Sequence, residues 1–408
     1  MDIAICGCGP SGLAAALVLQ AQGHTVSLFE RFDAPQAVGS GIILQPTGLA
    51  VMDALGLRDD IASLGHRINV LTGHSMPRHK RVLNVDYQAL GIDTQGLAVH
   101  RAALFDVLYA RVNALGITVQ SSTDIQQLVD NSARVSLVDQ HGVQSRAFDL
   151  CVDATGSRSP LHPYARTPPT RRALQYGAIW GTLDWPQGVF EPHKLHQRYV
   201  AAHTMIGVLP IGRHANANAD QAAFFWSVRN DAIDTWRAAG LDEWKAQVRA
   251  IWPDTEVLLE QIHHPDQMTF ARYGHHTLRY PYGQRLVFIG DAAHATSPQL
   301  GQGANMGLLD AWALGLALEG AGTDAEDIES ALKRYANLRR LHVRLFQLAS
   351  LSLTPFYQSD SRVLAALRDL MFDPLSRLPG IRQLVAGLVT GLLTRPLKTL
   401  QLGSDSSA

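Results

Sequence analysis

A glycine-rich turn close to the start of the chain is the first group of residues that could do chemistry. Residues 7–12 read GCGPSG, which has GxGxxG spacing. Gly7 permits a tight turn, Gly9 lets the backbone approach a pyrophosphate, and Gly12 lets a helix pack closely on a strand. The helix that follows would point its free N–H groups and its positive dipole end at the phosphates. The turn therefore predicts a dinucleotide site.

The dinucleotide prediction depends on the elements that surround this turn. Residues 2–6 read as a buried strand, residues 13–23 as a helix, and residues 24–30 as a second strand. This strand–helix–strand order is the context that the motif requires. Glu30 ends the second strand, where its carboxylate would accept hydrogen bonds from the hydroxyls of an unphosphorylated ribose, as in NAD or FAD. Arg31 follows directly, so the choice between these dinucleotides stays open at this point.

A second open loop lies far from the first along the chain. Residues 290–307 read GDAAHATSPQLGQGANMG and follow the apolar run RLVFI. The loop carries one acid, Asp291, one proline and almost no bulky side chains, and it is longer than a surface turn requires. A helix is expected to begin near Ala304. His294 lies one turn from Asp291, and we expect a structural rather than a catalytic role for it.

Composition excludes several classes of protein. The 408 residues carry 35 basic and 36 acidic side chains, a net charge of −1, so we expect no nucleic-acid partner. Three cysteines are too few for a disulfide framework, and no signal peptide is recognisable, so a cytoplasmic location fits. The apolar run at 384–394 is too short to span a bilayer, which favours packing in the core or between subunits. The histidine pairs at 263–264 and 275–276 lack acids and cysteines at ligand spacing, so we expect no metal.

The order of the elements predicts an α/β protein with an inserted domain. Residues 66–95 read as strands with turns, and residues 166–273 as further strands rich in aromatic residues, with one helix over 231–252. This pattern is typical of an α+β unit with a mostly antiparallel sheet. From Asp310 onward the chain reads as helical, with residues 404–408 disordered. The predicted division is a discontinuous dinucleotide-binding domain (1–66, 95–165 and 272–320), a substrate domain (67–94 and 166–271) and a C-terminal helical region (321–408).

Three separated segments resemble those of one family. They are GCGPSG with Glu30, FDLCVDATGSR at 148–158, and GDAAHATSPQLGQGANMGLLDAWAL at 290–314. The sequence resembles class A flavoprotein monooxygenases of the para-hydroxybenzoate hydroxylase type, and the resemblance covers essentially the whole chain. It implies a Rossmann-like FAD-binding domain with an inserted substrate domain and C-terminal helices. It also implies that FAD binds non-covalently and that NADH or NADPH visits it transiently.

The resemblance implies a reaction as well as a cofactor. In this family FAD reduced by NADH or NADPH reacts with O2 to form a flavin C4a-hydroperoxide, which hydroxylates or epoxidises a small aromatic or quinoid substrate in a site that excludes water. The expected partners are therefore a small aromatic molecule and O2, and the expected assembly is a monomer or a homodimer. Contact of the C-terminal helices with a membrane surface stays open.

The resemblance assigns the FAD site residue by residue. The pyrophosphate would lie on the glycines of the first turn, and the adenosine ribose on Glu30. Arg101 would contact the flavin nucleotide, and Asp291 its sugar alcohol chain. Residues 39–42 (GSGI) would lie against one side of the flavin ring. The implied cofactor-binding residues are Gly7, Gly9, Gly12, Glu30, Arg31, Gly41, Ile42, Arg101, Asp291, Gly301, Gln302, Gly303, Ala304 and Asn305.

The environment of the reactive flavin ring is predicted at Pro298, Gly301 and Gly303. Glycines there would let the backbone lie against the ring, so that N–H dipoles stabilise its negative charge. The helix from Ala304 would aim its positive dipole end at the pyrimidine side of the ring, and Asn305 would add polar contacts. No side-chain base can be assigned. The segments expected to face the cleft between the domains carry Arg198, Tyr199, His203 and Tyr273.

One position departs from the family pattern. The middle motif usually ends in Asp-Gly, whereas here Thr155 precedes Gly156, and Asp153 stands two residues before Thr155. This departure leaves the choice between NADH and NADPH open. It also motivates an alternative function, a related flavin reductase or dehydrogenase without oxygen transfer. A non-catalytic flavoprotein that binds a small molecule is a further alternative.

Overall fold

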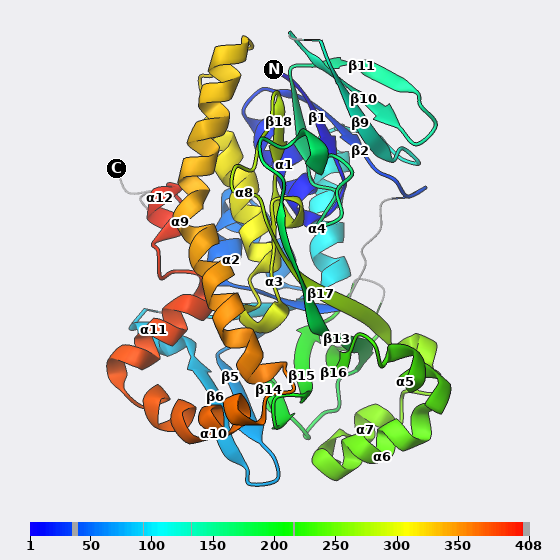
Figure 1. The fold of residues 1–408 in the computed structure, drawn as a ribbon, viewed down its shortest axis with the longest axis vertical. Coiled ribbons are helices and arrows are strands. Elements are labelled where there is room, and N and C mark those ends of the chain that lie inside the picture. Colours follow the sequence, from blue (N-terminus) through cyan, green and yellow to red (C-terminus); the bar gives the residue numbers. More distant parts are fainter. Residues whose placement is uncertain (35–39, 93, 132, 215–216, 403–408) are drawn as a thin grey trace.

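A parallel five-stranded sheet forms the centre of the upper part of the molecule in Figure 1. The computed structural model describes residues 1–34, 40–92, 94–131, 133–214 and 217–402. The strand order is β18-β12-β1-β2-β8, and all four pairings are parallel. Strands such as β1 are apolar and buried along nearly their whole length, because both faces of the sheet are covered. Helices pack on one face, and a small antiparallel sheet within residues 125–148 packs on the other. The strands are β1 (Asp2–Cys6), β2 (Thr25–Phe29), β8 (Thr118–Gln120), β12 (Leu150–Asp153) and β18 (Leu286–Phe288).

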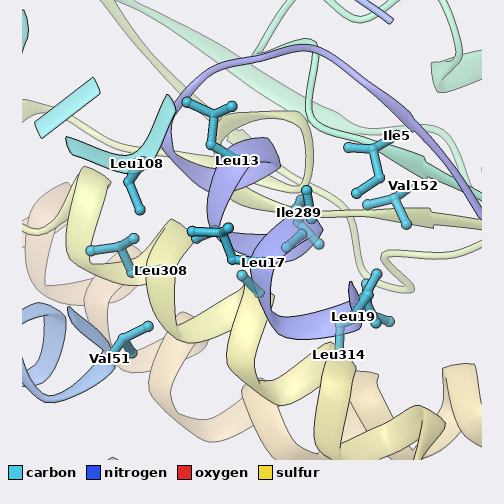
Figure 2. Packing of buried hydrophobic residues seen from close by; sticks show 14 of the residues in the cluster. Ile5, Leu13, Leu17, Leu19, Val51, Leu108, Val152, Ile289, Leu308 and Leu314 are labelled. Atoms are coloured by element: carbon cyan, nitrogen blue, oxygen red, sulfur yellow. The ribbon is translucent and has the colours of Figure 1, made fainter. Parts of the chain in front are cut away.

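Helices α1 (Pro10–Ala21), α4 (Arg101–Ala114) and α8 (Gly303–Leu318) pack together beside this sheet. Figure 2 shows Leu13 and Leu17 of α1 among side chains from α8 and from the ends of the strands. A Cβ atom at Gly315 of α8 would lie 2.4 Å from a methyl of Val18, so a glycine there permits the close approach of α1 and α8. This contact joins the two glycine-rich segments of the sequence in one core.

A mixed eight-stranded sheet forms the lower part of the molecule in Figure 1. Its order is β19-β17-β13-β16-β15-β14-β5-β6, with one parallel pairing, β14 with β5, among antiparallel ones. One face packs on α5 (Ile233–Ala239), α6 (Leu241–Ile251) and α7 (Glu256–Leu259) through a tryptophan-rich cluster. The strands are β5 (Val70–Ser75), β6 (Lys80–Asp86), β13 (Thr170–Asp184), β14 (Lys194–Val200), β15 (Thr204–Gly212), β16 (Gln221–Arg229), β17 (Thr269–Thr277) and β19 (His294–Ala295).

The C-terminal helices connect the two parts. Helix α9 (Ala325–Tyr357) runs the length of the molecule in Figure 1, from the parallel sheet to the opposite face of the eight-stranded sheet. Helices α10 (Arg362–Ser376) and α11 (Pro379–Thr390) pack beside β6, and α12 (Pro396–Thr399) packs beside α2 (Pro46–Ala54). No helix among the described residues is long and apolar enough to cross a membrane.

Two small antiparallel sheets and several short helices complete the fold. The sheets have the orders β11-β10-β9 and β3-β7-β4. Their strands are β3 (Gly41–Leu44), β4 (His66–Ile68), β7 (Gly96–His100), β9 (Ile125–Asp130), β10 (Val135–Asp139) and β11 (Gln144–Phe148). The remaining α-helices are α2 (Pro46–Ala54) and α3 (Arg58–Ala62). Short 3-10 helices span Tyr87–Leu90, His162–Tyr164, Pro253–Thr255, Pro265–Gln267, Gly290–Ala292 and Pro298–Leu300.

The predicted fold class is confirmed: a Rossmann-like parallel sheet, a second and mostly antiparallel sheet, and a helical C-terminus. The single helix predicted over 231–252 is wrong, because Gly240 has φ +79° and separates α5 from α6. The domain boundaries stay a prediction, and β17 crosses the one at residue 272. The predicted disorder at 404–408 concerns residues outside the described part of the chain.

Candidate cofactor and substrate site

In the first glycine turn, the space at the Cβ position of Gly9 is open, whereas the Cβ positions of Gly7 and Gly12 are crowded by other atoms. Gly7 has φ +101°, and a Cβ there would lie 2.6 Å from the carbonyl oxygen of Ala154. At Gly12 a Cβ would lie 2.0 Å from the carbonyl oxygen of Gly7. At Gly9, which directly precedes α1, no atom lies within 4 Å of the Cβ position. The turn is therefore closed on the protein side and open on the side where a pyrophosphate would lie.

Glu30 lies directly beside this turn. Its side chain is buried, Oε2 accepts a hydrogen bond from the N–H of Cys8 at 2.8 Å, and Oε1 accepts one from the N–H of Phe32 at 3.2 Å. Each carboxylate oxygen keeps further lone pairs for a ribose hydroxyl. Arg31 is exposed, and its guanidinium lies over the ring of Phe32, 4.6 Å from the centroid. Glu30 is thus held against the turn, whereas Arg31 points along the surface.

The middle motif packs on the same turn through Ala154. Just before it, Asp153 accepts hydrogen bonds at Oδ1 from the N–H and the hydroxyl of Thr155, at 2.9 and 2.7 Å, and at Oδ2 from the hydroxyl of Ser159. Burial raises the pKa of Asp153, and these three hydrogen bonds lower it. Thr155, the departure from the family pattern, therefore serves to bind the buried Asp153 and to hold the loop in place.

Asp291 and Arg101 face the same space from distant parts of the chain. Asp291 lies in the 3-10 helix Gly290–Ala292 and is exposed to solvent, yet the surrounding protein raises its pKa. The charge of Arg101, the first residue of α4, acts on Asp291 and lowers that pKa in turn. The structure therefore brings together two of the residues predicted to bind the flavin nucleotide.

A buried ion cluster holds the segment that carries Asp291. Asp310 of α8 accepts hydrogen bonds from the N–H of Gly290 at 2.8 Å, from Nε2 of His294 at 2.7 Å and from Nε of Arg339 at 2.6 Å. All three side chains of this cluster are buried. The neighbouring His294 and Arg339 hold the pKa of Asp310 at about 2, although burial alone would raise it. His294 is thus paired with Asp310 rather than with Asp291.

Hydroxyl groups of helix α9 hydrogen-bond to the start of the loop that is predicted to lie beside the flavin ring. The Ser297 hydroxyl lies 2.9 Å from that of Ser350 and 2.7 Å from that of Thr354, both on α9, and all three are buried. Gly301 ends the following 3-10 helix with φ +61°. At Gly303, the first residue of α8, no atom lies within 4 Å of a Cβ position. The front of the loop is therefore open, as a site for a flat ring requires.

The side chain of Asn305, a predicted cofactor-binding residue, is hydrogen-bonded within the protein. Its Oδ1 accepts a hydrogen bond from the N–H of Gln45 at 2.8 Å, and its Nδ2 donates to the carbonyls of Ile43 and Gly301, each at 3.0 Å. The side chain is fully buried, so it ties the loop to β3 instead. Gln302 is also buried and donates to the carbonyl of Val389. For Gln302, Ala304 and Asn305 only backbone groups stay candidates for the cofactor.

The segment predicted for the other side of the ring is only partly described, because Gly39 lies outside the described residues. Gly41 begins β3, and a Cβ there would lie 2.4 Å from Cγ2 of Ile211. A glycine is therefore required at Gly41 for packing against β15. Ile42 is half-buried and lies next to it in β3.

Of the four side chains considered for the cleft, three lie elsewhere. Tyr199 is buried beside Tyr357, at 5.2 Å between ring centroids. Arg198 lies over the ring of Trp252 and lines a separate surface hollow of about 310 Å³. His203 is exposed. Tyr273 is half-buried, and its oxygen accepts a hydrogen bond from Nε1 of Trp180 at 2.7 Å.

The histidine pairs show no ligand geometry. Among the residues that the structure describes, no group of three or more His, Cys, Asp or Glu side chains could hold a metal ion. His276 donates from Nε2 to the carbonyl of Ala292 at 2.9 Å, and Nε2 of His162 lies 2.8 Å from the same oxygen. Burial lowers the pKa of His276 to about 4, so it is a neutral donor that holds the segment next to Asp291.

The sequence of residues 1–347 matches the family described as FAD binding domain. Salicylate hydroxylase of Pseudomonas putida is 27% identical over 405 residues, which cover 92% of this chain and 90% of that protein. Hispidin-3-hydroxylase of Neonothopanus nambi is 26% identical over 386 residues, 83% of this chain and 85% of that protein.

Solved structures share the fold. Klebsiella pneumoniae HpxO, complexed with FAD and uric acid, aligns with a TM-score of 0.80 at 20% identity, over 96% of this chain and 98% of that one. Pseudomonas aeruginosa PqsL, in complex with 2-aminobenzoylacetate, aligns with a TM-score of 0.77 at 20% identity, over 90% and 99%. At these identities the likeness concerns the fold alone.

Proposed function

The chain belongs to the FAD-binding-domain family as a class A flavoprotein monooxygenase, and we propose that it uses NADH or NADPH and O2 to hydroxylate a small aromatic compound. The relatives are named as monooxygenases and hydroxylases of aromatic compounds. A reductase without oxygen transfer and a non-catalytic binding protein are therefore not favoured.

The observation that carries this proposal is a pair of open glycine positions, at the starts of α1 and α8. Gly9 and Gly303 each leave free the space that a side chain would fill, although both lie at the start of well-packed helices. Asp291 and Arg101 are both exposed and lie close enough for their charges to interact, and Glu30 is hydrogen-bonded to Cys8 beside Gly9. An elongated dinucleotide with a charged centre and a flat ring fits this set of groups.

Different residues would bind different parts of FAD, which when bound supplies the redox and oxygen chemistry. The N–H groups at the start of α1 would bind the pyrophosphate, and Asp291 would accept hydrogen bonds from the sugar alcohol chain. The N–H groups at the start of α8 would face the ring and stabilise negative charge on it. The packing of α9 against the Ser297 loop would keep water from the reactive end.

The finer assignments stay proposals. We expect one reduced nicotinamide nucleotide and one O2 to be consumed in each turnover, and a monomer or homodimer in the cytoplasm. The choice between NADH and NADPH depends on groups outside the middle motif, because Thr155 is used to bind Asp153.

The proposed activity can be tested with the purified holoenzyme. The protein is expected to be yellow and to oxidise NADH or NADPH slowly until an aromatic substrate is added. A panel of hydroxylated aromatic compounds should contain at least one that accelerates the oxidation and acquires one atom of ¹⁸O from ¹⁸O2. Hydrogen peroxide in equal amount to the nucleotide consumed, with no oxygenated product from any compound, would contradict the proposal.

An Asp291→Ala variant is expected to bind FAD about tenfold more weakly, since it loses an acceptor for the sugar alcohol hydroxyls. The dissociation constant is measured by fluorescence titration of the apoprotein with FAD. Asp242→Ala, at an exposed acid in α6, is the matched control and should bind FAD as the wild type does. If Asp291→Ala also kept wild-type affinity, Asp291 would not be a cofactor ligand.

A further inference from the structure

The outer surface of the C-terminal helices is apolar and basic. We propose that this surface, centred on helix α10, binds the protein to an anionic lipid membrane from one side. None of its residues belongs to the proposed FAD site, so the binding does not depend on the monooxygenase activity. The ligand class is a lipid bilayer whose headgroups carry negative charge.

The charged residues in the middle of α10 face the protein. Arg368 is fully buried, and its Nε and Nη2 donate to Oδ1 of Asp369 at 2.9 and 2.7 Å. The other oxygen of Asp369 accepts a hydrogen bond from the hydroxyl of Ser75 on β5. One turn further along α10, Oδ1 of Asp373 accepts a hydrogen bond from Nε of Arg81 on β6 at 2.8 Å. These contacts determine which face of α10 lies against the sheet.

The opposite face of α10 is apolar and exposed. Val363 and Leu370 are 76% and 67% exposed, and Leu367 and Met371 are each 40% exposed. These residues occupy positions i, i+4, i+7 and i+8, so they form one stripe along the helix. A helix on a protein surface normally turns such a stripe to the core and its charges to water. In α10 the two faces are exchanged, as expected where an apolar partner covers the helix.

The charges around this apolar face have one sign. Residues 333–402 carry 11 of the 35 basic side chains of the chain and three of its 36 acidic ones, so the remainder of the chain is net acidic. Among residues 361–402 the two acids, Asp369 and Asp373, are half-buried and paired as described above. Every exposed charged side chain in this range is therefore basic. These side chains are Arg362, Arg377, Arg382, Arg395 and Lys398.

The hairpin beside α10 adds to the basic rim. The turn that joins β5 to β6 leads into three consecutive exposed residues, Arg78, His79 and Lys80. The next residue, Arg81, is the one paired with Asp373 of α10, so this turn lies close to the helix. Figure 1 shows the hairpin and α10 together at the lower end of the molecule. Two segments far apart in the sequence thus bring basic side chains to the same edge.

The signs of the charges favour a lipid surface over a second copy of the chain. In a symmetric dimer the same patch meets itself, so the apolar stripes would match but the basic rim of one copy would face that of the other. An anionic membrane is complementary to both parts of the surface. The apolar side chains enter the boundary of the acyl chains, while the long Arg and Lys side chains reach the lipid phosphates.

The test is flotation of the purified holoenzyme with lipid vesicles. Vesicles of equal parts phosphatidylcholine and phosphatidylglycerol are compared with vesicles of phosphatidylcholine alone. The wild type should partition roughly tenfold more strongly onto the anionic vesicles, and added salt should weaken this binding. Leu370→Glu should bind them roughly tenfold more weakly than the wild type, because a carboxylate replaces an inserted apolar side chain. Val143→Glu, at an exposed apolar residue between β10 and β11, is the matched control and should bind like the wild type.

A second variant tests the basic rim. Arg78→Gln combined with Lys80→Gln should lower binding to the anionic vesicles roughly tenfold and leave binding to the neutral ones unchanged. Arg237→Gln, at an exposed arginine of α5, is its control and should have no effect.

The outcomes separate this inference from the proposed function. Leu370→Glu should retain FAD and the wild-type rate with a dissolved substrate. A wild type that does not float with anionic vesicles, or equal effects of Leu370→Glu and Val143→Glu, would overturn membrane binding whatever the activity of the enzyme. A dimer that Leu370→Glu converts to a monomer in analytical ultracentrifugation, without vesicle binding by the wild type, would assign the face to a second copy of the chain instead.

Discussion

In a Gly9→Val variant, FAD binding is expected to fall at least roughly 100-fold, about 2.7 kcal/mol, while the protein stays folded. The reason is the asymmetry of the first turn. No protein atom lies within 4 Å of a Cβ at Gly9, so the new side chain meets nothing in the folded chain. It would occupy the space through which the backbone approaches the pyrophosphate. The purified variant should therefore be colourless, with wild-type far-UV circular dichroism.

Two other glycines make this prediction specific. Gly380 in α11 also has no atom within 4 Å of a Cβ position, so Gly380→Val should fold and bind FAD like the wild type. Gly12→Ala should behave differently from both, because its Cβ would lie 2.0 Å from the carbonyl oxygen of Gly7. That variant should lose stability as well as FAD. A yellow Gly9→Val protein with wild-type affinity would mean that the pyrophosphate does not lie on this turn.

The cofactor half of the site could be predicted from the sequence because its chemistry depends on local backbone geometry. A turn followed by a helix places Gly7, Gly9 and Gly12 in fixed relation, and an acid at the end of the next strand must lie nearby. The structure places Glu30 there, hydrogen-bonded to Cys8. Asp291 could not be assigned from local backbone geometry, because its neighbour Arg101 lies on α4, which is far from Asp291 in the sequence. Only the resemblance to a family linked these two residues.

Side-chain partners could not be predicted where long-range packing decides them. Asn305 was expected to contact the cofactor, yet its amide ties α8 to β3 through hydrogen bonds to three backbone groups. Asp310 belongs to no motif in the sequence, where it reads as one polar residue of an apolar helix. An acid inside a helix whose other residues are nearly all apolar is itself a signal, because a buried charge requires a partner.

The residues of the substrate-binding part of the site were less predictable, because long-range packing also decides which side chains face it. Strand alternation says that neighbouring residues face opposite sides, but not which side faces the cleft. Arg198 and Tyr199 thus seemed equivalent in sequence, whereas one lies on the outer face and the other in a core beside α9. The partner of Tyr273 is Trp180 on β13, a residue 93 positions away, which no local pattern connects with it.

Replacing Asp310 by alanine is expected to lower the free energy of unfolding by about 3–5 kcal/mol. The substitution leaves the buried guanidinium of Arg339 without its carboxylate and frees His294 and the N–H of Gly290. Urea denaturation of the holoenzyme and of the apoprotein measures the loss. Since Gly290 adjoins Asp291, the variant should also retain less FAD. Asp231→Ala removes an exposed acid paired with Arg229 and should change the unfolding free energy by less than about 1 kcal/mol.

The pH dependence distinguishes a lost ion cluster from a lost packing contact. The pKa of Asp310 is about 2 in the folded protein, below the ordinary value of about 3.9 for an unfolded chain. A carboxylate with a depressed pKa stabilises the fold above its unfolded pKa, and this contribution disappears as the pH falls through the folded pKa. The difference in stability between wild type and Asp310→Ala should therefore shrink by about 2 kcal/mol between pH 5 and pH 2. A difference that stayed constant over this range would show that the Asp310 side chain stabilises the protein through its volume, and that the charges of His294 and Arg339 are balanced by other groups.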